Sequence, residues 1–423
     1  MKIGTSEKLI TPEPGIELCG YLLREQPSTG KYDELYARAL YIESYGNKII
    51  WLHCDLIGFS NELARHIRNA VAEISAIDVV NVFLSATHTH AGPATVFLRK
   101  CGDINPEYVE FLKKTIIASV KDALTNIEDV TMHFSESAVE GISFDRTKSP
   151  KNSHVDNALP VLAFKREDGT FKAIFTNFAM HNVGLSSNNR KISSDIAGFA
   201  AARAGTLIKG RPAVFLTNGG CGNINPSLVA DDYSGVEKAG TILGDSIAAE
   251  ISRLSECSDC AVSASFTELE LPLDVITKEK LAEIADAHQR SFDSREDNFF
   301  TRRFREAIRI WSDETGEIIE NKKPLKPAIS YTHILKIGGL TFIGINAEVF
   351  SKMAEQLRAL TGIRKLYVTG YTDGCIGYLA QAAMYNEGGY AVGDAHKFYG
   401  HFGLKSGGFE MLRDSIVEKL LKK

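Results

Sequence analysis

Apolar runs of strand length that end in polar side chains are the feature of this sequence that most constrains its fold. One run spans Val79 to Leu84, others end at His53-Cys54-Asp55 and at Asn346-Ala347-Glu348, and another leads directly into His181. A helical pattern from Asn61 to Ile74 lies between two of these runs. Strands that alternate with helices indicate an α/β fold, in which ligands gather at the carboxyl ends of strands. We therefore expect a functional site built from strand ends and loops.

The segment Ser85 to Pro93 places two imidazoles where a strand ends and a loop begins. If strand geometry continues past Leu84, His88 and His90 project from the same face and can serve one site. A neutral imidazole offers a nitrogen lone pair to a metal ion or to a proton. The alternative is a pair of loop histidines bonded to the backbone, and this segment by itself favours neither interpretation.

A glycine-rich loop, Thr217 to Ser227, follows the apolar run Ala213 to Leu216. Its glycines let the backbone approach a ligand and point amide groups toward it. No Gly-Lys-Ser/Thr follows and no Gly-x-Gly-x-x-Gly is present, so a phosphate-binding loop is excluded. Cys221 in this loop raises the alternative of a thiol enzyme, but a cysteine behind a strand is more typical of packing.

Charge and composition limit the class of partner and the cellular setting. Lys plus Arg number 48 against 53 Asp plus Glu, a net charge of −5, which argues against a nucleic-acid partner. No apolar run reaches the length of a membrane span and the N-terminus has no secretion signal, so we expect a cytoplasmic protein. The seven cysteines do not form a disulfide framework, and Cys257-Ser-Asp-Cys260 is expected to be incidental.

Residues Thr277 to Trp311 have a charged helical pattern with an apolar stripe that includes Phe300, Phe304 and Trp311. Arginines flank the stripe, and a basic amphipathic helix can lie on a membrane. We expect the stripe to pack on the core instead, because that is the common use of such a face. Residues Asp313 to Lys326 are predicted to be a polar connection.

Helix starts and a hairpin are predicted from local signals. Asn105-Pro106-Glu107 predicts a helix start, and Ser234-Gly-Val-Glu237 predicts a capping box for a helix that ends near Ile251. Leu159 to Phe164 and Phe171 to Phe178 are predicted to pair as a hairpin. The stretch from Gly141 to Pro150 is expected to be irregular.

The order of short motifs along nearly the whole chain resembles the neutral, non-lysosomal ceramidase family, specifically its N-terminal catalytic domain. The matching motifs are Ile10-Thr11-Pro12, Ser85 to Pro93, Asp145-Arg146 followed by Ser149-Pro150, Asn177 to His181, Ser193-Ser194-Asp195, Asn218 to Pro226, Ala347-Glu348, Gly377-Tyr378, Tyr385 and Gly388-Gly389-Tyr390. The resemblance implies an α/β mixed-sheet catalytic domain over residues 1–423 as a single unit. The chain resembles a short bacterial-type member without the family's C-terminal immunoglobulin-like domain.

The resemblance also implies a catalytic zinc ion held by two histidines, a glutamate and a tyrosine. Matched position by position, the ligands are His88, His181, Glu348 and Tyr378, with Tyr385 in the same loop as the alternative phenol. Nitrogen and oxygen donors of this kind suit zinc, and a catalytic site also keeps one position open for water or substrate.

Four further residues correspond to the family's catalytic and substrate-binding positions. His90 and Arg146 resemble the substrate-binding residues, and Tyr390 resembles a tyrosine that hydrogen-bonds the reacting group. Asn225 stands where the family carries its serine nucleophile, and because an amide cannot attack a carbonyl, a covalent route through this position is excluded. Asn225, His90 and Tyr390 would instead stabilise the developing oxyanion, while Arg146 holds an anionic or hydroxyl part of the substrate.

The resulting hypothesis is a zinc-dependent hydrolase that uses metal-activated water on an amide or related acyl bond of a small polar substrate. One alternative is a ceramidase that acts on an N-acyl sphingoid lipid, which is ranked lower because only the Phe300 stripe offers an apolar entrance. The other alternative is a non-catalytic metal-binding or regulatory protein that lost its chemistry when serine became Asn225.

Overall fold

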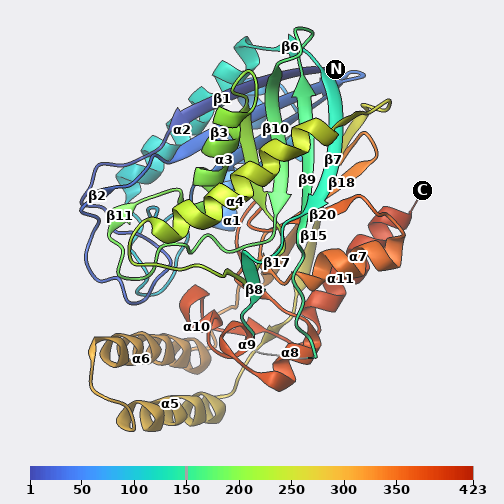
Figure 1. Cartoon of the computed structure of the whole chain (residues 1–423). Coiled ribbons are helices and arrows are strands. Elements are labelled where there is room, and N and C mark those ends of the chain that lie inside the picture. The colour runs from blue at the N-terminus through green and yellow to red at the C-terminus, as the bar shows by residue number, and fades with distance from the viewer. Residues whose placement is uncertain (148–150, 423) are drawn as a thin grey trace.

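The computed structural model of the chain describes residues 1–147 and 151–422, so that Ser149-Pro150 of the motif after Arg146 lies outside the described residues. Within them, the strands form three larger sheets and four two-stranded ladders, with helices on the outer faces (Figure 1). The fold is mixed α/β, as the sequence predicted.

The first sheet has the strand order β5-β4-β3-β1-β6. Its strands are β5 (Val82–Ala86), β4 (Asn47–Cys54), β3 (Tyr36–Ser44), β1 (Lys2–Leu9) and β6 (Glu128–Asp129). The second sheet has the order β12-β10-β9-β7-β14. Its strands are β12 (Ala213–Asn218), β10 (Phe171–Phe178), β9 (Ala158–Lys165), β7 (Thr131–Ala138) and β14 (Ser255–Glu256). The predicted hairpin is the antiparallel pair β9 and β10.

The third sheet has the order β15-β17-β18-β20. Its strands are β15 (Val262–Leu271), β17 (Ala328–Ile337), β18 (Leu340–Ile345) and β20 (Leu366–Thr369). The short ladders join β2 (Gly30–Lys31) to β11 (Lys191–Ile192), β8 (Ser143–Asp145) to β13 (Ile224–Pro226), β16 (Leu273–Asp274) to β22 (Gly403–Leu404), and β19 (Glu348–Val349) to β21 (Tyr378–Leu379).

Each of the three larger sheets carries a parallel strand pair at one edge, and a helix connects the two strands of that pair. The units are β4-α1-β5 with α1 (Asn61–Ser75), β10-α3-β12 with α3 (Asp195–Leu207), and β18-α7-β20 with α7 (Lys352–Thr361). A parallel connection requires such a crossover, and it leaves the carboxyl ends of both strands on one side. Three loop clusters of this kind therefore become available to a single site.

The three sheets share one aromatic core between their inner faces. The Trp51 and Phe83 rings of the first sheet stack at 4.8 Å, and Phe175 of the second sheet packs edge-on against Trp51 at 4.8 Å. Phe342 of the third sheet meets Phe175 at 5.1 Å. Burying each such ring is worth about 1.5–3 kcal/mol, so this cluster fixes the relative positions of the three sheets.

Helices cover the outer faces of the sheets. The helices α2 (Pro106–Thr125) and α1 pack with the first sheet, α3 and α4 (Ser234–Glu250) with the second, and α7 and α11 (Gly408–Leu421) with the third. The predicted start of α2 is confirmed, because the Asn105 side chain accepts a hydrogen bond from the Tyr108 amide at 3.0 Å.

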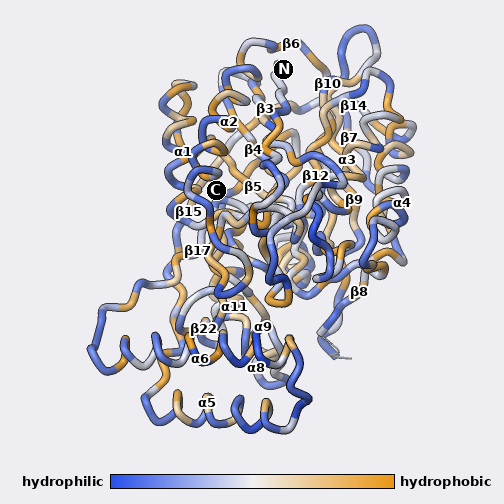
Figure 2. The backbone as a smooth tube through the Cα atoms, turned by 90° about the vertical axis from the view of Figure 1, so that its left-hand side faces the viewer, coloured by the Kyte–Doolittle hydropathy of each residue, from blue (hydrophilic) through white to orange (hydrophobic). Residues whose placement is uncertain are grey.

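A helical hairpin of α5 (Lys278–Asp293) and α6 (Phe299–Glu320) lies below the sheets, with α5 on the far side of α6 (Figures 1 and 2). Three short helices, α8 (Ala382–Glu387), α9 (Tyr390–Gly393) and α10 (His396–Tyr399), lie near it. Ile308 and Trp311 of α6 are buried, so this part of the stripe packs inward as expected, whereas Phe300 at its start is 40% exposed. In the described part of the chain, no helix is both long and apolar enough to cross a bilayer.

Several local predictions were wrong. Residues Val79–Asn81 form a short 3-10 helix, and the strand begins only at Val82. The helix α6 continues through Glu320 into the stretch predicted to be a polar connection, because its apolar face still has the core of the hairpin to pack against. No capping box forms at Ser234; the Asp232 carboxylate accepts hydrogen bonds from the Ser234 amide and hydroxyl instead. Within the stretch expected to be irregular, Ser143–Asp145 forms a strand.

Candidate metal centre

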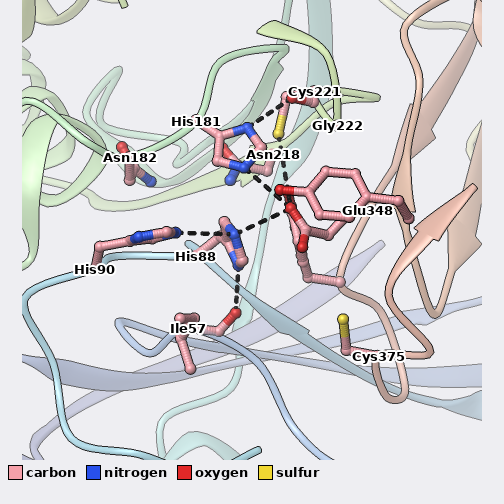
Figure 3. A network of polar contacts seen from close by, with 12 residues as sticks. Ile57, His88, His90, His181, Asn182, Asn218, Cys221, Gly222, Glu348 and Cys375 are labelled. Atoms are coloured by element: carbon pink, nitrogen blue, oxygen red, sulfur yellow. Dashed lines mark hydrogen bonds and ion pairs between the residues drawn. The ribbon is translucent and has the colours of Figure 1, made fainter. Parts of the chain in front are cut away.

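Three buried side chains meet at the carboxyl ends of strands from the three crossover units. His88 follows β5, His181 follows β10, and Glu348 follows β18 at the start of β19. The Oε2 atom of Glu348 lies 3.0 Å from Nε2 of His181 and 3.4 Å from Nε2 of His88 (Figure 3). These residues were predicted to meet from distant parts of the sequence, and the structure brings them together.

The outward nitrogen of each imidazole fixes its tautomer. Nδ1 of His88 lies 2.6 Å from the Ile57 carbonyl oxygen, and Nδ1 of His181 lies 2.7 Å from that of Cys221 (Figure 3). A carbonyl oxygen only accepts, so both Nδ1 atoms carry a proton. Burial lowers the pKa of His181 to about 4, which keeps its ring neutral near pH 7. Its Nε2 lone pair is therefore directed at Glu348.

His90 joins the same cluster. Its Nε2 lies 3.2 Å from Nε2 of His88, and ligand atoms of His88, His90 and His181 all lie within 4.8 Å of one another. Burial, followed by the neighbouring imidazoles, holds the pKa of His90 well below its usual value. Converging lone pairs and a carboxylate repel one another unless they share a cation or a proton, so these residues fit a divalent ion that prefers nitrogen and oxygen donors, as zinc does. His88 and His181 belong to every such set, with Glu348 or His90 as the third member.

The two histidines of the Ser85 to Pro93 segment meet through a turn and not through strand alternation. The strand ends at Ala86, and His88 has a left-handed backbone with φ of +61°. That conformation is costly for a residue other than glycine, and hydrogen bonds compensate for it. The Thr87 carbonyl accepts from the side-chain amides of Asn182 and of Asn218, the latter at 2.6 Å.

Arg146 links the glycine-rich loop to Tyr378. Its Nη2 donates to the Gly222 carbonyl at 2.7 Å and to the Tyr378 hydroxyl at 2.8 Å, and its Nη1 donates to Oδ1 of Asn225 at 3.2 Å. The ladder between β8 and β13 carries both Asn225 and the strand end before Arg146. The Tyr378 hydroxyl thus accepts its hydrogen bond from Arg146 and does not contact the Glu348 carboxylate. The Tyr385 hydroxyl donates to the Leu404 carbonyl at 3.1 Å.

Two tyrosines that the sequence reasoning missed contact the carboxylate. Tyr371 stacks on the His88 ring at 3.9 Å, and its hydroxyl lies 3.4 Å from Oε2 of Glu348. Tyr399 donates its hydroxyl to Oε1 of Glu348. The abundance of Gly and Tyr after residue 370 was the available signal, but it could not say which phenols reach the site.

A cavity of about 510 Å³ opens over the cluster. Its polar lining includes His88, His90, Arg146, Asn225, Glu348 and Tyr390. Its apolar lining includes Leu22, Leu23, Val229, Phe300, Phe304 and Phe398. The residues predicted to act on the substrate therefore share one cavity, and the Phe300 stripe of α6 forms part of its wall.

Cys221 does not have the properties of a nucleophile. The side chain is buried, and burial raises the pKa of its thiol to about 12. The reactive form of cysteine is the thiolate, which this environment disfavours. Its Sγ atom lies 3.4 Å from the Tyr371 hydroxyl, which agrees with packing behind the site.

Known proteins resemble the chain both in sequence and in fold. Residues 1–214 match the family model described as "Neutral/alkaline non-lysosomal ceramidase, N-terminal". The neutral ceramidase of Drosophila pseudoobscura pseudoobscura is 24% identical over 222 residues, 47% of this chain and 31% of the relative. That of Pseudomonas aeruginosa is 24% identical over 221 residues, 47% of this chain and 33% of the relative. The alignments thus span about a third of each relative's own length.

The crystal structure of the neutral ceramidase from Pseudomonas aeruginosa superposes on the whole of this chain and on 75% of its own, with a TM-score of 0.76 at 18% identity. That likeness establishes a shared fold. Because the family model covers half of the sequence, the chain belongs to the neutral/alkaline non-lysosomal ceramidase family.

Proposed function

We propose that this protein is a metal-dependent hydrolase that cleaves the amide bond of an N-acyl substrate with a long apolar chain, as in ceramide-type lipids. The observation that carries the proposal is a buried cluster of His88, His181 and Glu348 beneath a cavity with apolar walls. The curated relatives, which are neutral ceramidases, support the same class of reaction. Because site residues follow strands of all three sheets, we propose that residues 1–423 act as one catalytic domain.

The cavity favours a lipid-like amide over the small polar substrate that we preferred from the sequence. Phe300 and Phe304 of α6, together with Phe398, line one side of the cavity. A small polar substrate would bury little of this apolar surface, whereas an alkyl chain gains about 0.8 kcal/mol of binding free energy for each CH₂ group that it buries. The alternative of an N-acyl sphingoid substrate therefore agrees better with the site.

We propose that zinc occupies the cluster, held by Nε2 of His88 and His181 and by Oε2 of Glu348. Bound there, zinc would lower the pKa of a water molecule toward neutrality and polarise a carbonyl group. Tyr378, which the family resemblance makes a phenol ligand, accepts a hydrogen bond from Arg146 at 2.8 Å, and its oxygen keeps a second lone pair for that role.

The remaining polar residues of the cavity would bind and orient the amide. The Oδ1 atom of Asn225 accepts from Arg146, so its Nδ2 group is free to donate to the carbonyl oxygen as negative charge develops there. Arg146, fixed by the Gly222 carbonyl, would direct its guanidinium at a substrate hydroxyl or anionic group. Tyr390 or His90, which lies beside His88, would hydrogen-bond the reacting group.

Turnover of paired substrates tests the proposal. Zinc-loaded protein is given palmitoyl-sphingosine in detergent micelles or an N-acetyl amino acid, and the released acid is measured by mass spectrometry. We expect release of palmitate, abolished by a chelator and in His181→Ala and Glu348→Gln, and unchanged in Cys257→Ala, which lies outside the cavity.

Two other outcomes would contradict the proposal. Cleavage of the short polar amide alone would restore the preference drawn from the sequence. No turnover of either substrate by zinc-loaded protein would favour a metal-binding protein without catalysis, for which Asn225 at the position of the family's nucleophile is the supporting observation.

A further inference from the structure

Tyr399 is one of two phenols that contact the carboxylate of the metal centre, and it does so at Oε1, whereas Tyr371 lies at Oε2. Tyr378 and Tyr385, the two phenols considered from the sequence, use their hydroxyl groups on Arg146 and on the Leu404 carbonyl. Tyr399, at the end of α10, donates to Oε1 of Glu348. Tyr399 lies 51 positions after Glu348 in the sequence.

The hydrogen bond from Tyr399 gives the two carboxylate oxygens of Glu348 different partners. Oε1 is taken by the Tyr399 hydroxyl, whereas Oε2 lies 3.0 Å from Nε2 of His181. The terminal torsion of a glutamate is broad, so a carboxylate without a fixed partner would turn either oxygen, or neither, toward the imidazoles. The Tyr399 hydroxyl on Oε1 therefore selects the orientation in which Oε2 faces the His181 imidazole and the Tyr371 hydroxyl.

The backbone at Gly377 holds the Tyr399 ring in place. Gly377 has φ of +89°, and a Cβ atom there would lie 3.2 Å from Cδ2 of the Tyr399 ring. The Gly377 carbonyl also accepts a hydrogen bond from the Glu348 amide at 2.9 Å. Gly377 therefore contacts both the backbone of Glu348 and the Tyr399 ring, whose hydroxyl contacts the Glu348 side chain.

We infer that Tyr399 is a positioning residue, which orients Glu348 so that Oε2 completes the metal site with His88 and His181. This inference rests on the proposed metal site. Outer-shell partners that orient a metal ligand typically change metal affinity by about 10- to 100-fold when they are removed. The role is outside the ligand set itself, because the hydroxyl is used on the far oxygen of the carboxylate.

Zinc affinity of Tyr399→Phe tests the inference, because phenylalanine keeps the ring against Gly377 and removes only the hydroxyl. We expect competition with a chromogenic chelator to give a zinc dissociation constant about 10- to 100-fold higher than that of the unsubstituted protein. The absorption spectrum of the cobalt-substituted protein should also change, since a reoriented carboxylate alters the coordination geometry. A merely structural role would leave that spectrum unchanged.

Tyr108→Phe is the matched control, because it removes a buried phenol hydroxyl that donates to the Ile10 carbonyl, outside the cavity. Its zinc affinity should equal that of the unsubstituted protein. Gly377→Ala is the second variant, and it should weaken zinc binding by displacing the Tyr399 ring.

The outcomes distinguish this inference from the proposed metal site. If the unsubstituted protein binds zinc and Tyr399→Phe binds it equally well with the same cobalt spectrum, the role of Tyr399 is overturned and the metal site stands. If the unsubstituted protein binds no zinc, both fall.

Discussion

A buried group of charges behind the metal centre makes the effect of replacing Asp373 large and specific. Its Oδ2 lies 2.6 Å from Nδ1 of His333, and its Oδ1 lies 3.4 Å from Nε of Arg68 and accepts from the Leu84 amide at 2.9 Å. Nε2 of His333 faces the Val80 carbonyl at 2.8 Å. Asp373 is thus the buried carboxylate that faces both the guanidinium of Arg68 and the ring of His333.

Asp373→Asn removes the charge and little else. Asparagine has the same shape and tolerates the left-handed backbone found here, with φ of +63°. Arg68 and His333 would remain buried without their anion, and breaking a buried ion pair from one side costs about 3–5 kcal/mol. The matched control is Asp313→Asn, whose exposed pair with Arg309 one helical turn away is worth about 0.3–0.5 kcal/mol.

Urea unfolding at neutral pH with a chelator present, followed by tryptophan fluorescence, measures both variants. We expect the free energy of unfolding to fall by about 3–5 kcal/mol in Asp373→Asn and to stay within about 0.5 kcal/mol in Asp313→Asn. A loss under about 1 kcal/mol in Asp373→Asn would refute the assignment of a buried charge cluster.

The same cluster fixes the pH dependence of this contribution. Burial alone would raise the pKa of Asp373, but Arg68 and His333 outweigh it and hold the pKa below 3.8. A carboxyl group whose pKa is lowered by folding stabilises the fold at pH values above its pKa in the unfolded chain. This stabilisation is lost as the pH falls through the pKa in the folded protein. The difference between the unsubstituted protein and Asp373→Asn should therefore persist at neutral pH and shrink only in strong acid.

Three further predictions concern the cavity. Glu348→Gln should weaken zinc binding by more than about tenfold in chelator competition, and His90→Ala should weaken it less; equal losses would make His90 a ligand. Replacing both Phe300 and Phe304 by serine should raise KM for a palmitoyl amide at least about tenfold and leave that for an acetyl amide unchanged, whereas parallel changes would argue against a chain-binding wall. Arg146→Lys should lower kcat/KM about 100-fold, because lysine keeps the charge but not the planar fork and loses charged hydrogen bonds worth about 1.5–3 kcal/mol each; activity within about twofold of the unsubstituted enzyme would contradict this.

Local patterns were sufficient to find the strand ends that carry the site. The runs before His88, His181 and Glu348 are apolar because both faces of their strands are buried, and this is visible without knowledge of the partners. The order of motifs then gave the family and the mixed α/β fold, both of which are confirmed.

Contacts made across the fold were beyond what local patterns contain. Tyr399 reaches Glu348 from α10, which packs against α6, α9 and β22, and Tyr371 stacks on His88 through a turn held by Asp373. No local sequence signal separates these two tyrosines from Tyr385, whose hydroxyl donates to the Leu404 carbonyl instead. For the same reason the apolar stripe of α6 could be assigned to the interior, but not to the wall of a cavity.

The hairpin of α5 and α6 occupies one uninterrupted stretch between β15 and β17, two neighbouring strands of the third sheet. The groups proposed to hold the ion all come from other parts of the chain. We therefore expect changes on the face of α6 that lines the cavity to alter which acyl chain is accepted, while the ligands proposed for the ion keep their sequence.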